Sequence, residues 1–125
     1  MPHISAADSP IFNLHGTQFI GLAAPSRGAT ENAVWRVSVA PGKAKGVPHQ
    51  LSREEILVAV AGEAVAKIGG VEYAFRAGDA IIIPAFTEFS LGNAGDDPFE
   101  AIAIFPVGGR AMIAGEAPFT PPWAA

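Results

Sequence analysis

The sequence predicts an all-β domain, built as a barrel or a sandwich of short strands. Three observations support this prediction. The 125 residues include 14 Gly and 11 Pro, which interrupt helices. No window of about a dozen residues keeps the apolar spacing of an amphipathic helix. Instead, short runs rich in Val, Ile and Phe recur and are closed by Gly, Pro or Asn, a pattern typical of barrels and sandwiches.

The chain opens with an expected hairpin. Ile11–Leu14 and Thr17–Leu22 are both apolar enough to form short strands. They flank His15-Gly16, and a two-residue connection that contains Gly is typical of a tight β-turn. We therefore expect these two segments to pair at one edge of a sheet.

Asn32–Val39 is the next expected strand. Successive side chains of a strand point to opposite faces, so Trp35, Val37 and Val39 should share one face. The polar residues between them should lie on the other face. Pro41 follows this strand and should end its pairing.

The middle of the chain predicts a buried strand and a hairpin. Glu55–Ala61 has apolar residues at both alternating sets of positions, which is expected for a strand that is covered on both faces. Ala64–Ile68 and Val71–Phe75 flank Gly69-Gly70, which accepts the positive φ angles of a tight hairpin.

The last strands are expected at Ala80–Ile83, Phe89–Leu91 and Phe99–Phe105. The last of these alternates strictly, with Phe and Ala at odd positions and Glu or Ile at even ones. The C-terminal segment Phe119–Trp123 is strongly apolar, so we expect it to lie on the barrel wall or on a second subunit.

The composition limits the classes of partner. Asp and Glu number 12 and Lys and Arg number 8, which gives a formal net charge of −4. No basic patch is available for phosphates, so nucleic acid is not an expected partner. There is no Cys, which removes disulfides and thiolate metal sites. Neither a membrane span nor a secretory leader is evident, so we expect a single cytoplasmic domain over residues 1–125.

Residues 42–62 contain a spaced motif that resembles the first motif of the cupin superfamily. That motif is usually Gly, five residues, His-x-His, three or four residues, Glu, six residues, Gly. His49, Glu55 and Gly62 match this spacing. Leu51 stands where the second His belongs, and six residues rather than five separate Gly42 from His49.

Residues 78–93 resemble the second motif of the same superfamily. That motif is usually Gly, five residues, Pro-x-Gly, two residues, His, three residues, Asn. Gly78, Pro84 and Asn93 match, whereas Phe86 replaces the Gly and Phe89 replaces the His. Fifteen residues separate the two motifs, as in compact bacterial single-domain cupins. Both motifs together imply a cupin-like jelly-roll β-barrel.

In this family, three His and one Glu converge inside the barrel on a divalent metal. The resemblance implies that His49 and Glu55 point inward here, while Leu51 and Phe89 offer no lone pair to a metal. It therefore implies a degenerate metal site in an apolar pocket. The residues expected to line this pocket are Trp35, Leu51, Leu57, Phe86 and Phe89.

An apolar pocket that keeps one polar pair predicts binding of a small, largely apolar molecule. Low dielectric raises the pKa of a carboxyl group and a nearby imidazolium lowers it, so His49 and Glu55 are candidate catalytic acid and base. This pair predicts metal-independent chemistry of the isomerase or cyclase type, with no cofactor.

Two alternatives stay open. The first is a metal-dependent dioxygenase or isomerase, in which His49 and Glu55 bind a divalent metal with a third ligand from His15, His3 or Glu54. The second is a non-catalytic, ligand-sensing or structural barrel, in which His49 hydrogen-bonds a loop carbonyl. The resemblance also implies a homodimer, with exchange of N-terminal strands as one way to form it.

Overall fold

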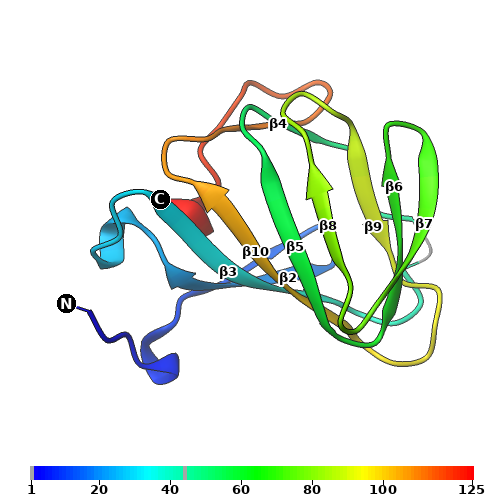
Figure 1. Ribbon diagram of the computed structural model, residues 1–125, viewed down its shortest axis with the longest axis horizontal. Helices are drawn as coiled ribbons and strands as arrows, with labels where there is room; N and C mark the ends of the chain where they lie inside the picture. Colours follow the sequence, from blue (N-terminus) through cyan, green and yellow to red (C-terminus); the bar gives the residue numbers. More distant parts are fainter. Residues whose placement is uncertain (1, 44) are drawn as a thin grey trace.

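The computed structural model describes residues 2–43 and 45–125 and shows two main sheets that face each other as a barrel (Figure 1). The larger sheet has the strand order β1-β2-β3-β10-β5-β8, and the smaller has the order β7-β6-β9. A short pair, β11-β4, forms a third sheet. The strands are β1 (Ile11–Leu14), β2 (Thr17–Ala23), β3 (Asn32–Val39), β4 (Gln50–Leu51), β5 (Glu55–Ala61), β6 (Glu63–Ile68), β7 (Val71–Arg76), β8 (Ala80–Ile83), β9 (Phe89–Gly92), β10 (Phe99–Pro106) and β11 (Ala111–Met112).

The predicted all-β fold is confirmed. The helical segments are single turns of 3-10 helix, η1 (Ala6–Asp8), η2 (Pro25–Arg27) and η3 (Pro122–Ala124). Within the described part of the chain, no helix is long and apolar enough to cross a membrane. The cytoplasmic location stays a prediction.

The predicted alternation of β3 and β10 is also confirmed. Trp35, Val37 and Val39 of β3 are buried, and so are the odd-numbered residues of β10, which include Phe99 and Phe105. The two strands are antiparallel neighbours in the middle of the larger sheet. Their inward side chains therefore form the centre of the core.

Strand β5 differs from the prediction on one face. Its inward residues Glu55 and Leu57 are buried, as expected. Its outward residues Ile56, Val58 and Val60 lie on the outer face of the larger sheet, and Val60 keeps 44% of its surface exposed. The prediction that both faces of β5 are covered is thus wrong for the single chain, because none of the described residues packs over the outer face of this strand.

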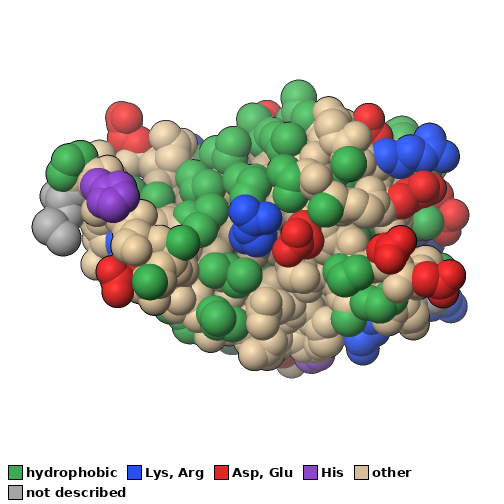
Figure 2. All heavy atoms as spheres, turned by 90° about the horizontal axis from the view of Figure 1, so that it is seen from below, with side chains coloured by type: hydrophobic (Ala, Val, Ile, Leu, Met, Phe, Trp, Pro, Cys, Tyr) green, Lys and Arg blue, Asp and Glu red, His purple; other side chains and the backbone are tan. Residues whose placement is uncertain are grey.

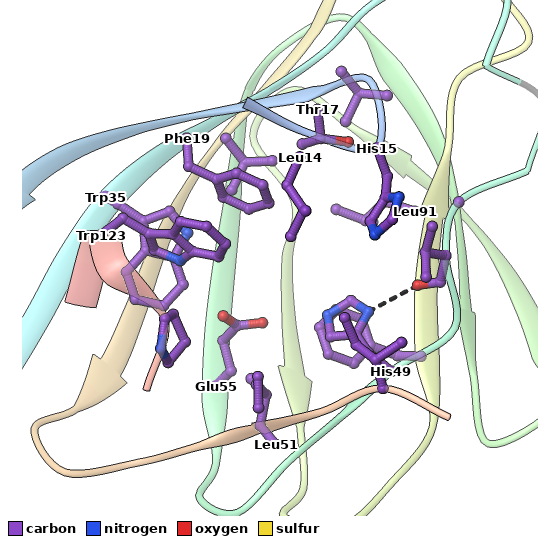
Figure 3. A pocket seen from close by; sticks show the side chains of 18 of the residues that line it. Leu14, His15, Thr17, Phe19, Trp35, His49, Leu51, Glu55, Leu91 and Trp123 are labelled. Carbon is purple, nitrogen blue, oxygen red and sulfur yellow. Dashed lines mark hydrogen bonds between the residues drawn. The ribbon is translucent and has the colours of Figure 1, made fainter. Parts of the chain in front are cut away.

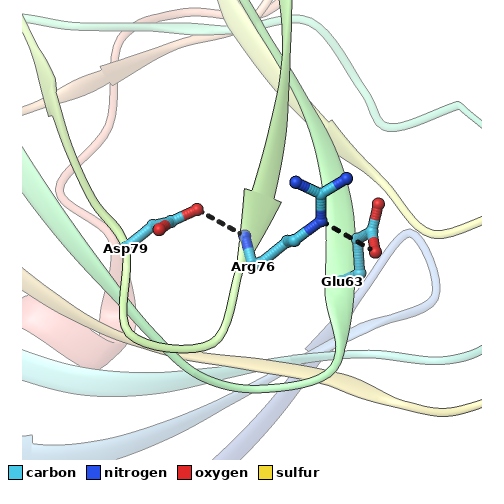
Figure 4. A network of polar contacts seen from close by, with 3 residues as sticks. All are labelled: Glu63, Arg76 and Asp79. Atoms are coloured by element: carbon cyan, nitrogen blue, oxygen red, sulfur yellow. Dashed lines mark hydrogen bonds and ion pairs between the residues drawn. The ribbon is translucent and has the colours of Figure 1, made fainter.

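The turn residues adopt the backbone conformations that the predicted hairpins require. His15 and Gly16 have φ angles of 52° and 78°, so both central residues of the β1–β2 turn have the positive φ of a type I′ turn. In the turn between β7 and β8, the Asp79 carboxylate accepts a hydrogen bond of 2.9 Å from the backbone N–H of Arg76 (Figure 4). The Arg76 side chain lies 3.2 Å from Glu63, an exposed ion pair that contributes little to stability.

The C-terminal segment packs against the barrel wall, as predicted. The Trp123 indole stacks on the Phe19 ring, with centroids 3.8 Å apart and planes 4° apart. The Ser26 hydroxyl donates a hydrogen bond of 2.7 Å to the carbonyl oxygen of Ala125. This packing makes the segment part of the wall of the internal cavity described next.

Candidate functional site

An internal cavity of about 110 Å³ lies within the barrel, and its wall is mostly aromatic and aliphatic. Figure 3 shows the side chains that line it, among them His49 and Glu55. Four of the five residues expected to line an apolar pocket do border this cavity. They are Trp35, Leu51, Leu57 and Phe89.

The fifth residue, Phe86, does not border the cavity, and this part of the prediction is wrong. Phe86 lies in the turn after β8 with a φ of 59°, the left-handed conformation that Gly adopts most easily. Its backbone N–H donates a hydrogen bond of 2.8 Å to the carbonyl of Leu51. The backbone therefore keeps the conformation expected of the motif Gly, and the side chain is 66% exposed.

His49 is held by its backbone and by one ring nitrogen. Its N–H and C=O form hydrogen bonds of 3.0 and 2.9 Å with the backbone of Phe89, whose ring lies 4.1 Å from the imidazole. Nδ1 lies 2.9 Å from the carbonyl oxygen of Val47 (Figure 3). A carbonyl only accepts, so Nδ1 carries the proton and the neutral ring keeps a lone pair on Nε2. Burial lowers the pKa of His49, and the hydrogen bond to Val47 opposes this only in part.

Glu55 opens strand β5 inside the barrel, where only 4% of its surface is exposed. Burial raises its pKa from the ordinary value of 4.5 to about 8. Among the described residues, no hydrogen bond or ion pair engages its carboxyl group, either with His49 or with any other side chain. In Figure 3 the carboxyl group points into the cavity. It is therefore a neutral, protonated acid near pH 7.

Several residues that border the cavity were not singled out as pocket residues from the sequence. Phe119 and Trp123 come from the C-terminal segment, whose apolar composition was the only signal. His15 comes from the β1–β2 turn and also borders the cavity. The other two candidates for a third metal ligand, His3 and Glu54, are exposed on the surface.

Two of the aromatic residues that line the cavity carry unpaired polar atoms. The indole nitrogens of Trp35 and Trp123 are buried without a hydrogen-bond partner among the residues that the structure describes. Their rings are 6.3 Å apart. An indole N–H can only donate, and a buried donor without a partner costs about 1–3 kcal/mol.

The residues at the four motif positions do not fit a resident divalent metal. His49, Leu51, Glu55 and Phe89 all border the cavity, but only the first and third have donor atoms. In the described ranges, no three His, Asp or Glu side chains come close enough to hold a metal ion. Imidazole and carboxylate sites that bind such metals for catalysis generally use three protein ligands.

Comparison with known proteins decides the family. A family profile described as "Cupin domain" matches residues 35–105, more than half of the chain. This chain belongs to the cupin family. The predicted resemblance is thereby confirmed, although no curated protein sequence matches this cupin.

Solved structures similar to this cupin confirm the fold. The polyketide cyclase RemF from Streptomyces resistomycificus is 15% identical with a TM-score of 0.79, over 94% of this chain and 87% of that one. An RmlC-like cupin from Shewanella frigidimarina is 17% identical with a TM-score of 0.71, over 85% and 90% of the two chains. A sugar phosphate isomerase of the cupin superfamily from Silicibacter pomeroyi is 17% identical with a TM-score of 0.70, over 92% and 83%.

Proposed function

We propose that this cupin binds a small, neutral, largely apolar molecule in its internal cavity. The observation that carries the proposal is the environment of Glu55, an unpaired and neutral carboxyl group in a mostly apolar wall. No Lys or Arg of the described chain borders the cavity, so a charged carboxylate or phosphate ligand would find no cation there.

The cavity volume limits the size of this molecule. A dry protein cavity of about 150 Å³ holds benzene, so a volume of about 110 Å³ limits the ligand to roughly one ring or a short chain at most. The aromatic wall, which includes Phe19, Phe89 and Trp35, favours a flat compound because aromatic groups stack. A carbonyl oxygen on the ligand would accept a hydrogen bond from the Glu55 carboxyl group.

We further propose that His49 and Glu55 act on the bound molecule as base and acid. The Nε2 lone pair of His49 would take a proton from the carbon next to a carbonyl, while Glu55 donates its proton to the carbonyl oxygen, which gives an enol. In a compound with a further double bond beyond that carbon the enol is a dienol, so His49 can return the proton to the far carbon of the dienol while Glu55 takes back its own, which moves the double bond into conjugation with the carbonyl. An enol can also attack a second carbonyl, the bond-forming step of a cyclisation. The structural similarity to a polyketide cyclase supports this class of reaction at the level of the fold.

Binding is tested with benzaldehyde and benzoate, two single-ring compounds of nearly equal size. We expect benzaldehyde to quench the tryptophan fluorescence of Trp35 and Trp123 and to bind at least tenfold more tightly than benzoate. Equal affinities for benzaldehyde and benzoate would contradict a binding site that contains no cation. Failure of both compounds to bind would contradict the proposed pocket.

Proton transfer is tested separately, by exchange of the protons next to the carbonyl of phenylacetaldehyde in D2O, followed by proton NMR. We expect exchange faster than in buffer, a large loss in His49→Gln and Glu55→Gln, and no change in Glu54→Gln, which alters the exposed neighbouring carboxylate. Binding without exchange would refute the catalytic proposal and favour the non-catalytic barrel. The metal-dependent alternative predicts a stoichiometric metal in protein purified without a His tag, lost on His49→Ala.

A further inference from the structure

The chain has two tryptophan residues, and both border the internal cavity. Trp35 lies on β3 and Trp123 lies in η3, so the fold brings them together from distant parts of the chain. Their ring centroids are 6.3 Å apart, and only 3% and 8% of their surfaces are exposed. We call Trp35 and Trp123 the tryptophan pair.

Both rings of the tryptophan pair are held in place by other aromatic side chains. Trp123 lies flat on Phe19, with centroids 3.8 Å apart. Trp35 meets Phe105 edge-on, with centroids 6.0 Å apart and planes at 78°. These contacts fix the direction of each indole N–H before a ligand enters. A ligand that accepts from groups already held in place loses less free energy to the ordering of the protein.

The two indole N–H groups are unpaired donors. Most buried polar side-chain atoms in proteins have a hydrogen-bond partner, so two exceptions in one cavity wall call for an explanation. The wall contains possible acceptors on Thr17, Glu55 and His49. None of them, nor any other described residue, forms a hydrogen bond with either indole nitrogen. An acceptor atom of a bound molecule would therefore gain a hydrogen bond here without breaking one within the protein.

The surroundings of the tryptophan pair favour an uncharged acceptor. Charged side chains lie on the outside of the molecule, as Figure 2 shows for one face. None of the described residues in the cavity wall is Lys or Arg, so an anion would be buried there without a cation. In Figure 3 Glu55 lies between the tryptophan pair and His49. An oxygen bound by the indoles is thus a different atom from the carbonyl oxygen that accepts from Glu55.

We propose that the tryptophan pair is a second binding subsite, which donates hydrogen bonds to an uncharged oxygen of the ligand. Together with the oxygen at Glu55, this subsite selects a molecule with two oxygen atoms on different sides of a single ring. The chemical class is a small cyclic diketone or a related ring with two neutral oxygens. This inference rests on the proposed function, because it requires a neutral molecule in the same cavity.

The test uses cyclohexane-1,4-dione and cyclohexanone, which share one ring and differ by one carbonyl group. Since the chain has two tryptophans, its ¹H–¹⁵N NMR spectrum contains two indole signals, one from each member of the pair. We expect the dione to move both indole proton signals downfield, as a new hydrogen bond does, and cyclohexanone to bind without this shift. By calorimetry the dione should bind about tenfold more tightly, because it pairs the free donors.

Trp35→Phe and Trp123→Phe remove the N–H group and keep an aromatic ring. Each variant should lose most of the preference for the dione while it still binds cyclohexanone. Phe119→Leu is the matched control, because it trims a ring of the same wall that has no donor. It should weaken both compounds by the same factor and so keep the preference. Circular dichroism checks that the variants are folded, and the wild-type spectra decide the question if one is not.

The outcomes separate this inference from the proposed function. Equal binding of the two compounds without a shift of the indole signals would overturn the subsite and leave the proposed function intact. A preference for the dione that persists in both tryptophan variants would also overturn the subsite. Failure of both compounds to bind would contradict the proposed function, and the subsite with it.

Discussion

Glu55→Gln is expected to change how the stability of this cupin depends on pH. Burial raises the pKa of Glu55 to about 8 in the folded chain, whereas the unfolded carboxyl group returns to the ordinary value of 4.5. Between these pH values the folded state holds a proton that the unfolded state has released. The free energy of unfolding therefore falls as the pH rises through this window, and below it both states are protonated. Glutamine does not titrate, so the variant lacks this loss.

The size of the effect follows from the two pKa values. One pKa unit corresponds to about 1.4 kcal/mol. For a group that titrates at 4.5 when unfolded and near 8 when folded, the wild type should lose on the order of 3 kcal/mol of stability between pH 5 and pH 8 relative to Glu55→Gln. This is a large part of the 5–15 kcal/mol that is typical for a domain.

Urea unfolding of both proteins at several pH values measures this difference. The lowered pKa of His49 makes the folded chain less stable as the pH falls below 6.5, because the unfolded chain then binds a proton that the folded chain does not. This effect acts in both proteins, so the difference between them isolates Glu55. Glu54→Gln is the matched control at an exposed carboxylate.

The reasoning about Glu55 would be refuted by a stability difference between wild type and Glu55→Gln that stays constant from pH 5 to pH 8. It would also be refuted by a wild type that gains stability relative to Glu55→Gln as the pH rises, since that sign belongs to a carboxylate stabilised in its charged form. A change of similar size in Glu54→Gln would show that the effect is not specific to the cavity.

Three further predictions concern the turn, the lost metal ligands and the C-terminal segment. Phe86→Gly should raise the melting temperature by relieving a left-handed backbone, a gain of up to about 1 kcal/mol; a lower melting temperature would contradict the conformation of this turn. Leu51→His with Phe89→His should create four donors around the cavity and bind one Zn²⁺ at least tenfold more tightly than wild type by calorimetry; no gain would contradict the placement of these positions. Trp123→Ala should lower the stability by about 2–4 kcal/mol in denaturant unfolding, because its ring packs on Phe19; a loss under 1 kcal/mol would show that the segment is not a structural wall.

Local patterns in the sequence predicted much of the fold. Alternation predicted the buried faces of β3 and β10, and the glycine-containing turns predicted the hairpins, because both depend on neighbouring residues only. The two-residue strands β4 and β11 were missed, since their pairing depends on a partner some sixty residues away along the chain. A run of two residues carries no periodicity by which it could be recognised.

The site was predicted in part. The motif spacing predicted that His49 and Glu55 face the interior. Phe86, which replaces the motif Gly, was expected in the pocket because its side chain is apolar. The left-handed backbone that a Gly usually provides is retained here, and it carries the ring outward. The contribution of Trp123 to the cavity wall arises from the return of the chain end to β2, a long-range contact with no local signature.

The central claim is that an apolar cavity holds a neutral Glu55 carboxyl group at physiological pH. The most direct measurement is a titration of the Glu55 carboxyl carbon by ¹³C NMR, assigned by comparison with Glu55→Gln. The account predicts a midpoint near 8, which corresponds to a protonated acid at pH 7. A midpoint near 4.5 would place a charged carboxylate in the barrel and contradict both the binding of neutral molecules and the proposed role of Glu55 as an acid.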